Sequence, residues 1–471
     1  MSAATDRAVR PTIDELVDSL EARYLARQSR SADLHRRASK VLAGGATSSW
    51  MITRPATLWM SHGRGSRVVD VDGHAYVDLH AGYGTMIVGH AHPAVVEAIE
   101  RRASLGTHFA QPTEDAIVVA ERLAARFGLP QWRFCNSGTE ATMDAVHLMR
   151  SVTGRDRLVK IEGTYHGHHD AVMVSVQGDR REIGPLSRPA SVVAGTGIPQ
   201  AMADLVSVVP FNDVAALERV LDEHRGQIAG VILEPMMTNV GLIVPDPGYL
   251  EAVRALTRQH GVLLAFDEVK TGLTVHPGGA TGLTGVVPDL VCLAKALGGG
   301  LPCGAIGGTT EVMSAITRGK YAQVGTFNGN PLTMAAARAT LDEVLVPAAY
   351  DRMERLGRRM IDGALAALTA AGVPAYGLQL GAKGCLVFHG SKLRNYRDFL
   401  KVEPVFSHLH WLVQHEHGVL LPPWGKSEQW TLSVQHSRQD AEVFVANVGI
   451  LAEELARLES WVPRHRRAAL H

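Results

Sequence analysis

Short apolar runs alternate with segments of helical pattern between residues 113 and 331, and this alternation limits the possible folds more than any other feature. The runs are QWRFCNSG, RLVKIEG, IAGVILEP, GVLLAFDEV, DLVCLAKA and CGAIGGT. Such alternation is typical of a mostly parallel β-sheet with crossover helices. The sequence therefore predicts a large α/β domain, and in open sheets of this kind ligands bind outside the carboxyl ends of the strands.

The segments on either side of this domain have different patterns. Apolar residues recur at helical spacing after a polar start that we expect to be disordered, which predicts one or two helices that pack on a partner subunit or cap their own domain. RVVDVDGHAYVDLH alternates around Asp72-Gly73 as a β-hairpin does. We expect five parts: a helical arm (1–43), the first part of a small α+β domain (44–112), the large domain (113–331), connecting helices (332–375) and a C-terminal small domain (376–471).

Charge and cysteine content narrow the function further. The 471 residues hold 47 Lys+Arg and 47 Asp+Glu, so the absence of net charge gives no support for binding to nucleic acid or a membrane surface. The four cysteines form no CxxC pair, no spacing suggests a metal site, and no apolar run is long enough to span a bilayer. We expect an ordinary cytoplasmic globular protein that acts on small molecules.

A lysine follows one of the apolar runs, in LVCLAKALGGGLP at residues 290–302. Lys295 has apolar neighbours, and burial favours the neutral form of an amine. A neutral amine is a nucleophile and can form a Schiff base with a carbonyl compound. The alternative is a surface lysine ahead of a turn.

An aspartate ends the preceding apolar run, in GVLLAFDEVKTGL. Asp267 precedes Lys295 by 28 residues, about one strand–helix–strand unit, so the two side chains are expected at neighbouring strand ends. A lysine that forms an imine and a carboxylate that pairs with a pyridinium nitrogen are the protein groups that pyridoxal phosphate needs. The alternative for Asp267 is a helix N-cap.

Further candidate residues follow other strands. Ser137, Gly138 and Thr139 lie at the predicted start of a helix, where backbone N–H groups and hydroxyls bind anions, and Thr326 opens a similar turn. Tyr165, in GTYHGHHD, has a ring that can stack on a flat cofactor. The histidines beside it are expected to be hydrogen-bonded wall residues, and the alternative for each helix start is an ordinary cap.

In this order and spacing the motifs resemble one family. NSGTEA, YHGHHD, EPMMTNVG, FDEVKTG, LAKALGGGLPCGAIGG and GTFNGNPLTMAA resemble the class III pyridoxal-phosphate aminotransferases, and within them the glutamate-1-semialdehyde 2,1-aminomutase branch, from about residue 34 to about residue 454. The resemblance implies the type I fold of these enzymes, with a small domain built from both termini. It also implies a homodimer with shared active sites.

The resemblance implies a role for each matching residue. Lys295 would hold the cofactor as a Schiff base and move protons, and Asp267 would pair with the pyridine nitrogen. Tyr165 would stack on the ring and Asn239 would lie near its 3-oxygen. The phosphate would be held by Ser137, Gly138 and Thr139 and by Thr326 of the partner subunit.

Departures from the family pattern concern the substrate. Met51 stands where the aminomutase has an arginine that fixes the substrate carboxylate, and methionine cannot form a bidentate pair with a carboxylate. We therefore predict an aminotransferase that uses an amine or amino acid donor and a keto acid or aldehyde acceptor, with an aminomutase as the alternative. A non-catalytic cofactor-binding fold is a third hypothesis, disfavoured by the intact lysine and aspartate. The residues expected near the substrate are Ser48, Met51, Tyr83, Lys270 and Glu428, with exposed charges predicted for Lys270 and for Arg54.

Overall fold

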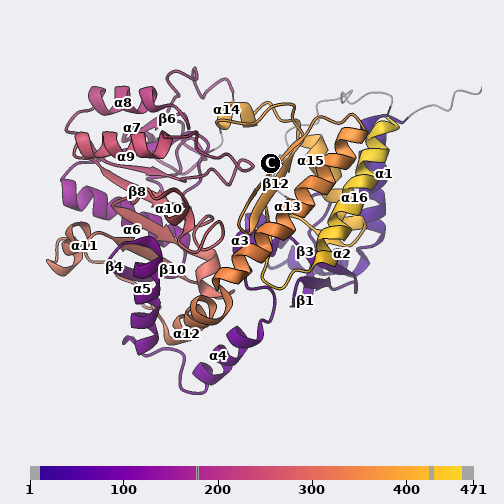
Figure 1. The fold of residues 1–471 in the computed structure, drawn as a ribbon, viewed down its shortest axis with the longest axis horizontal. Helices are drawn as coiled ribbons and strands as arrows, with labels where there is room; N and C mark the ends of the chain where they lie inside the picture. The colour runs from indigo at the N-terminus through magenta and orange to yellow at the C-terminus, as the bar shows by residue number, and fades with distance from the viewer. Residues whose placement is uncertain (1–10, 177, 179, 424–428, 459–471) are drawn as a thin grey trace, which may run out of the picture.

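The computed structural model describes residues 11–176, 178, 180–423 and 429–458. The large domain, on the left in Figure 1, is built around a seven-stranded sheet. The strand order is β4-β10-β9-β8-β7-β5-β6, and of these strands only β10 runs antiparallel to its neighbours. The bounds are β4 Gln131–Cys135, β5 Arg157–Ile161, β6 Val206–Val209, β7 Ile228–Leu233, β8 Leu263–Asp267, β9 Leu290–Leu293 and β10 Gly304–Gly308. The prediction of a mostly parallel sheet is confirmed, although the apolar runs did not include β6.

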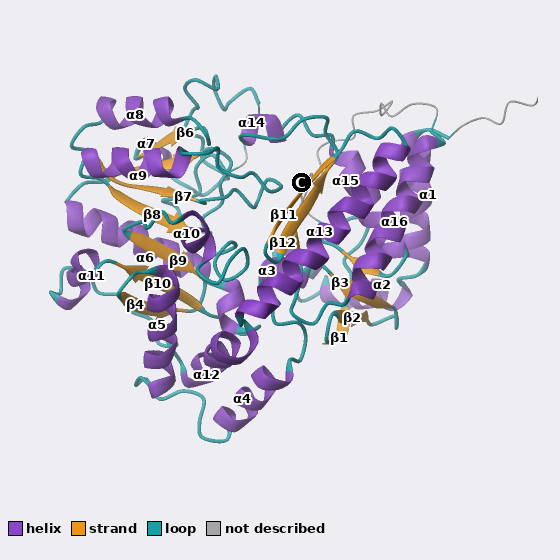
Figure 2. Cartoon of the chain, viewed as in Figure 1, coloured by secondary structure: helices purple, strands orange, loops and turns teal. Residues whose placement is uncertain are grey.

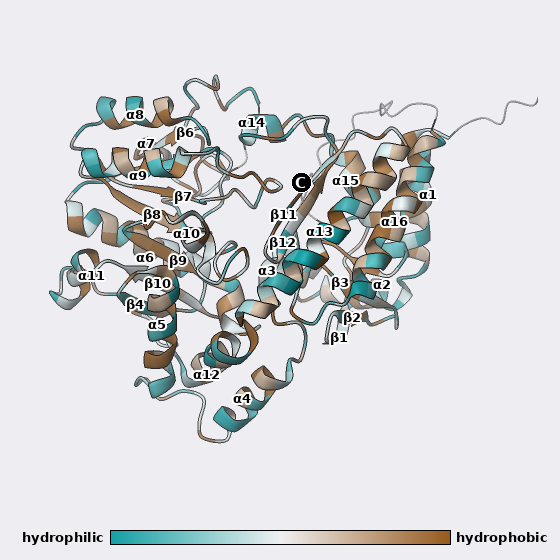
Figure 3. Ribbon diagram, in the orientation of Figure 1, coloured by the Kyte–Doolittle hydropathy of each residue, from teal (hydrophilic) through white to brown (hydrophobic). Residues whose placement is uncertain are grey.

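Helices cover this sheet because its central strands are apolar throughout. All six residues of β7 are buried, as a parallel strand covered on both faces requires. Figure 2 shows helices on both sides of the strands of this sheet, and Figure 3 shows that the strands are largely brown (hydrophobic) while the helices carry teal (hydrophilic) stretches. The helices of this domain are α5 Glu114–Phe127, α6 Gly138–Thr153, α7 Gln200–Asp204, α8 Val214–Glu223, α9 Tyr249–Gln259, α10 Gly279–Thr284 and α11 Thr310–Thr317.

The small domain combines strands from both ends of the chain, as the fold prediction requires. β13 (Val419–Leu420) pairs in parallel with β3 (Ala75–Asp78), which forms the predicted hairpin with β2 (Arg67–Asp70). A three-stranded sheet lies beside them. The remaining strands are β1 Met60–Arg64, β11 Tyr376–Leu380, β12 Lys383–Val387 and β14 Trp430–Thr431, and the longer helices are α13 Pro347–Ala370, α15 Pro404–Glu416 and α16 Arg438–Ala456.

The N-terminal arm packs on the small domain of its own chain. It consists of α1 (Ile13–Ala26) and α2 (Ser29–Ala38), and the Tyr24 ring of α1 lies 5.5 Å from the Trp411 ring of α15. Of the two roles expected for the arm, the structure thus has it cap its own domain. The other α-helices of the described residues are α3 (Ala81–Gly84), α4 (Pro93–Ala103), α12 (Pro331–Ala339) and α14 (Tyr396–Phe399).

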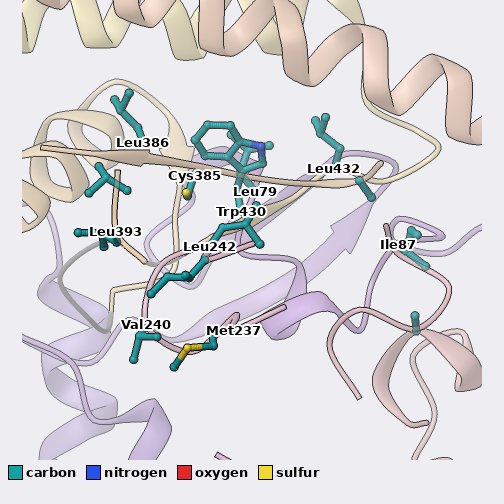
Figure 4. Packing of buried hydrophobic residues seen from close by; sticks show 14 of the residues in the cluster. Leu79, Ile87, Met237, Val240, Leu242, Cys385, Leu386, Leu393, Trp430 and Leu432 are labelled. Carbon is teal, nitrogen blue, oxygen red and sulfur yellow. The ribbon is translucent and has the colours of Figure 1, made fainter. Parts of the chain in front are cut away.

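The two domains share one core beside the carboxyl ends of the central strands (Figure 4). Met237, Val240 and Leu242, from the loop after β7, are buried in the same cluster as small-domain residues such as Cys385 and Trp430. Burying such side chains stabilises by about 1.5–3 kcal/mol each, so the loop that carries Asn239 is firmly held between the domains.

Two general expectations can be compared with the described residues. None of the helices in this part of the chain combines the length and the apolar character that crossing a membrane requires. All four cysteines are free and buried, and burial raises the pKa of the Cys303 thiol to about 12. The predicted domain boundaries stay predictions.

Candidate active site

Asp267 and Lys295 lie at the carboxyl ends of two neighbouring strands of the central sheet. Asp267 ends β8 and is paired in register with Cys292 of the neighbouring strand β9, and Lys295 follows three residues later. Asp267 is 5% exposed, and Lys295 is half-buried with a left-handed φ of 46°. The Asp267 Oδ1 atom accepts the Val269 N–H at 3.0 Å, but the next helix, α10, begins only at Gly279, so Asp267 is not a helix N-cap.

His166 stands behind Asp267. Its Nδ1 atom lies 2.8 Å from Asp267 Oδ2, and the imidazole is 1% exposed. No described residue gives His166 Nε2 a hydrogen-bond partner. The imidazole and the Val269 N–H thus fix the orientation of the carboxylate. A hydrogen-bonded histidine was predicted here, but its partner Asp267 was not, because the contact joins segments about a hundred residues apart.

Glu234, at the end of β7, joins the two loops that carry Tyr165 and Asn239. Its Oε1 atom accepts the Tyr165 N–H at 3.1 Å and the Asn239 side-chain amide at 2.9 Å. Its Oε2 atom accepts the Thr238 N–H at 2.8 Å. Burial, and then Asp267, raise the pKa of the Tyr165 hydroxyl, so the ring beside the carboxylate stays neutral. Glu234 was not among the predicted site residues.

The N-terminus of α6 faces the same edge. Ser137 is the N-cap of this helix, and its hydroxyl accepts the Glu140 N–H at 3.2 Å. A side-chain methyl at Gly138 would lie 2.8 Å from Val269, so glycine lets the helix end approach the residues after Asp267. The Thr139 hydroxyl accepts the His168 N–H at 3.2 Å. The positive end of a sixteen-residue helix therefore meets the strand ends.

These residues fit pyridoxal phosphate. A buried, oriented carboxylate suits a protonated ring nitrogen, a half-buried lysine suits an aldehyde, and a helix N-terminus with hydroxyls suits a phosphate. The described residues contain no group of three His, Cys, Asp or Glu side chains that could hold a metal ion.

The predicted substrate residues of the N-terminal half gather around Trp50. Ser48 is the N-cap of a 3-10 helix over Ser49–Met51, and the Met51 side chain is 53% exposed. The Tyr83 hydroxyl donates to the Trp50 carbonyl at 3.0 Å, and the Trp50 ring lies 5.7 Å from the rings of Tyr83 and Tyr165. Trp50 thus links the segment that contains Ser48 and Met51 to Tyr165, a connection that the sequence did not predict.

The expectation of exposed charges is wrong for Lys270. Its side chain is 8% exposed, and the ammonium donates to the Thr238 carbonyl at 3.0 Å, an acceptor supplied by a loop distant in sequence. Arg54 is 39% exposed and pairs with Glu21 of α1 at 3.0 Å. Glu428 lies outside the described residues.

Thr326 lies in an exposed turn between α11 and α12. The turn is tied to α6, because the Tyr321 hydroxyl donates to Asp144 Oδ1 at 2.6 Å and the Gln323 amide donates to Asp144 Oδ2 at 3.1 Å. The predicted contact of Thr326 with the cofactor of a partner subunit stays a prediction.

Comparison with known proteins gives the family. The aminotransferase class-III family model matches residues 48–383. The chain belongs to the class III aminotransferases. Glutamate-1-semialdehyde 2,1-aminomutase of Methanothermobacter thermautotrophicus is 39% identical over 417 residues, which cover 88% of this chain and 96% of that relative. Glutamate-1-semialdehyde 2,1-aminomutase 2 of Brevibacillus brevis is 38% identical over 392 residues, covering 82% and 88%.

Solved structures agree in fold. An omega-transaminase from Sphaerobacter thermophilus has a TM-score of 0.87 at 36% identity, covering 91% of this chain and 98% of its own. A glutamate-1-semialdehyde aminomutase from Pseudomonas aeruginosa in complex with PMP has a TM-score of 0.84 at 31% identity, covering 94% and 98%. The predicted family, fold and pyridoxal-phosphate cofactor are confirmed, while relatives of two activities leave the reaction open at this level.

Proposed function

We propose that this class III enzyme is an aminotransferase that moves an amino group between an amine or amino acid donor and a keto acid or aldehyde acceptor. The observation that carries the proposal is the juxtaposition at the strand ends: Asp267, held by His166, stands beside the strand that leads to Lys295. Bound pyridoxal phosphate would supply an electron sink for the carbon that loses a proton.

Each residue then has a task in the reaction. The Asp267 carboxylate would pair with the ring nitrogen of the cofactor, and His166, whose Nδ1 atom lies 2.8 Å from Asp267 Oδ2, would hold that carboxylate in place. The Lys295 amine would hold the cofactor and, when free, would move a proton at the substrate carbon. Tyr165 would cover the ring of the cofactor, and Asn239 would bind near its 3-oxygen.

The phosphate site would be shared between two subunits. Ser137, Gly138 and Thr139 would bind the phosphate from one chain, and Thr326 of the partner subunit would bind it from the other. Two apolar side chains of the same turn support this arrangement, since Val324 is 83% exposed and Phe327 is 58% exposed in a single chain. Large exposed apolar side chains beside a site are typical of a surface covered by a partner. We propose a homodimer, and free cysteines suit the reducing cytoplasm.

The alternative is an aminomutase, which moves the amino group within one substrate. The names of the curated relatives favour it. Met51 disfavours it, because a thioether cannot replace a cation that fixes a substrate carboxylate. Lys270 is a weak substitute, since its ammonium is buried and already donates to the Thr238 carbonyl.

One pair of assays separates the two reactions. The purified enzyme, supplied with pyridoxal phosphate, is incubated with a panel of amines and α-, β- and ω-amino acids plus a keto acid, and separately with glutamate-1-semialdehyde alone. We expect net transfer of the amino group to the keto acid and no isomerisation. Isomerisation without net transfer would establish the aminomutase, and absence of a visible absorption band from bound cofactor would contradict both reactions.

A further inference from the structure

A pair of charged side chains, a buried Glu162 and an Arg397 that is 17% exposed, lies directly beneath the loop that carries Tyr165 and His166. Glu162 follows β5 and is 1% exposed. Its two carboxylate oxygens accept hydrogen bonds from Nε and Nη2 of Arg397, each at 2.7 Å. Arg397 lies in α14, which belongs to the C-terminal part of the chain, so the pair joins segments 235 residues apart.

The same guanidinium holds a third segment. Arg397 Nη2 donates to the Ile183 carbonyl at 2.7 Å, and Nη1 donates to the Gly184 carbonyl at 3.0 Å. The neighbouring ring of Tyr396 lies over Gly163 so closely that a side-chain methyl there would overlap it. Figure 1 shows α14 apart from the other C-terminal helices, on the side of the large domain.

The loop is also held from its inner side. Lys160, near the end of β5 and 1% exposed, donates its ammonium to the Thr164 carbonyl at 2.9 Å and to the Val174 carbonyl at 2.6 Å. The start of the loop 163–166 is therefore held by Lys160 on one side and by Glu162 and Arg397 on the other. Tyr165 and His166 extend from this part of the loop toward Asp267.

We propose that Arg397 and Glu162 are a positioning pair for the reaction, which sets Tyr165 and His166 in their places against the cofactor and Asp267. The inference rests on the proposed function, because it takes Tyr165 and Asp267 as cofactor contacts. Neither member of the pair touches the reacting atoms, and both act through the loop between them.

Stability alone is a poor explanation for this pair. Removing two charges from water costs about as much as their attraction returns, so a buried ion pair is a weak source of stability. A planar guanidinium that makes two parallel hydrogen bonds and two further bonds to carbonyl groups instead fixes the relative position of three segments. Such precision is needed where a misplacement of about 1 Å can cost about 10²-fold in rate.

The chain offers a matched control pair at the opposite edge of the sheet. Arg254 of α9 donates to both oxygens of Asp289 at 2.7 and 2.8 Å, and both side chains are 14% exposed. Asp289 directly precedes β9, so this pair lies at the amino ends of the strands. In both pairs an arginine makes two hydrogen bonds to one carboxylate, and the pairs lie at opposite ends of the strands.

The experiment compares Arg397→Met and Glu162→Gln with Arg254→Met and Asp289→Asn in the holoenzyme. The readouts are thermal stability, the circular dichroism of the cofactor band, the affinity of cofactor-free protein for pyridoxal phosphate, and kcat against KM. We expect all four variants to lose stability. Only the first two should change the cofactor dichroism, weaken cofactor binding, and lower kcat about 10²-fold with little change in KM.

Further outcomes keep the inference separate from the proposed function. Arg397→Lys keeps the charge but not the planar fork, so it should resemble Arg397→Met in cofactor dichroism; full rescue by lysine would overturn the geometric role. Cofactor signals that match those of the Arg254 variants would overturn the inference and leave the proposed function standing. If wild type binds no cofactor, the proposed function fails, and hydrogen exchange of residues 163–176 in cofactor-free Glu162→Gln still decides whether the pair holds the loop.

Discussion

Charged residues at the amino ends of the central strands have a different role from those at the carboxyl ends. We call these two sides of the sheet the amino edge and the carboxyl edge. At the amino edge, the Asp289 carboxylate accepts hydrogen bonds from the Arg254 guanidinium and the Leu264 N–H. The Arg155 guanidinium donates to the carbonyls of Ile228 and Gly261. These contacts tie neighbouring strands together.

At the carboxyl edge, Glu234 and Asp267 accept hydrogen bonds from loops, Glu162 accepts hydrogen bonds from Arg397 of α14, and Lys295 has a left-handed φ of 46°. Such backbone strain costs about 1–3 kcal/mol and persists where the surroundings impose it. Charged groups at the amino edge therefore hold neighbouring strands together, while the carboxylates at the carboxyl edge hold the loops and the helix that surround Asp267.

The largest difference between the edges should appear when one cation is removed from each. Lys295→Ala should lower amino transfer by about 10³-fold or more, with native stability, because it removes both the nucleophile and the proton carrier. Arg155→Ala should keep the activity and lower the free energy of unfolding by about 2 kcal/mol, since two hydrogen bonds from a charged group are lost. Steady-state rates and urea unfolding of both variants provide the measurement; an active Lys295→Ala enzyme would refute its assignment.

The two aspartates give the next comparison. Asp267→Asn should lower kcat about 10²-fold, because a neutral amide no longer stabilises a protonated ring nitrogen. Asp289→Asn should cost about 3 kcal/mol of stability, since Arg254 then loses its buried counter-charge, and should leave kcat unchanged. Equal effects of the two substitutions on kcat would show that the edges do not differ as proposed.

Features set by residues close together in the sequence could be predicted, and contacts between residues far apart in the sequence could not. The strands after which Asp267 and Lys295 lie were predictable, because apolar runs and a spacing of 28 residues are local signals. β6 was missed, since it is a four-residue strand at the sheet edge and carries little pattern. The His166–Asp267 contact and the burial of Lys270 were not predictable, because each depends on a partner from a distant loop. The same holds for Arg397, whose charge alone suggests an exposed helix residue.

Two glycines with the same backbone conformation test the edges without changing any charge. Gly163 follows β5 at the carboxyl edge and Gly226 precedes β7 at the amino edge, and both have φ of 79°. Gly226 has open space around it, so Gly226→Ala should cost only the left-handed conformation, about 1 kcal/mol. Gly163→Ala should cost about 2 kcal/mol more, because the methyl displaces Tyr396, and it should also perturb the cofactor dichroism. Urea unfolding of both variants checks the difference, and equal losses would mean that α14 yields without strain.

A further comparison concerns a proton on Lys160, near the carboxyl end of β5. Burial lowers the pKa of Lys160 to about 7, although Glu234 and then Glu162 partly oppose the shift. Between about pH 7 and the ordinary lysine pKa of about 10.4, the unfolded chain binds a proton that the folded chain does not, so this lysine's contribution to stability rises with pH by up to about 1.4 kcal/mol per unit. Below about pH 7 both states are protonated and the slope disappears.

Lys160→Met should remove that slope, because methionine does not titrate. The measurement is the free energy of unfolding of wild type minus that of the variant, followed from about pH 7 to about pH 9, so that the buried thiols and tyrosines cancel. Arg155→Ala, two residues before the start of β5, should keep the same dependence of unfolding free energy on pH as wild type, since arginine stays charged throughout this range. A flat difference for Lys160→Met would mean that the buried ammonium keeps its proton through the carbonyl groups of Thr164 and Val174, and that the charges at the carboxyl edge are balanced without any proton release.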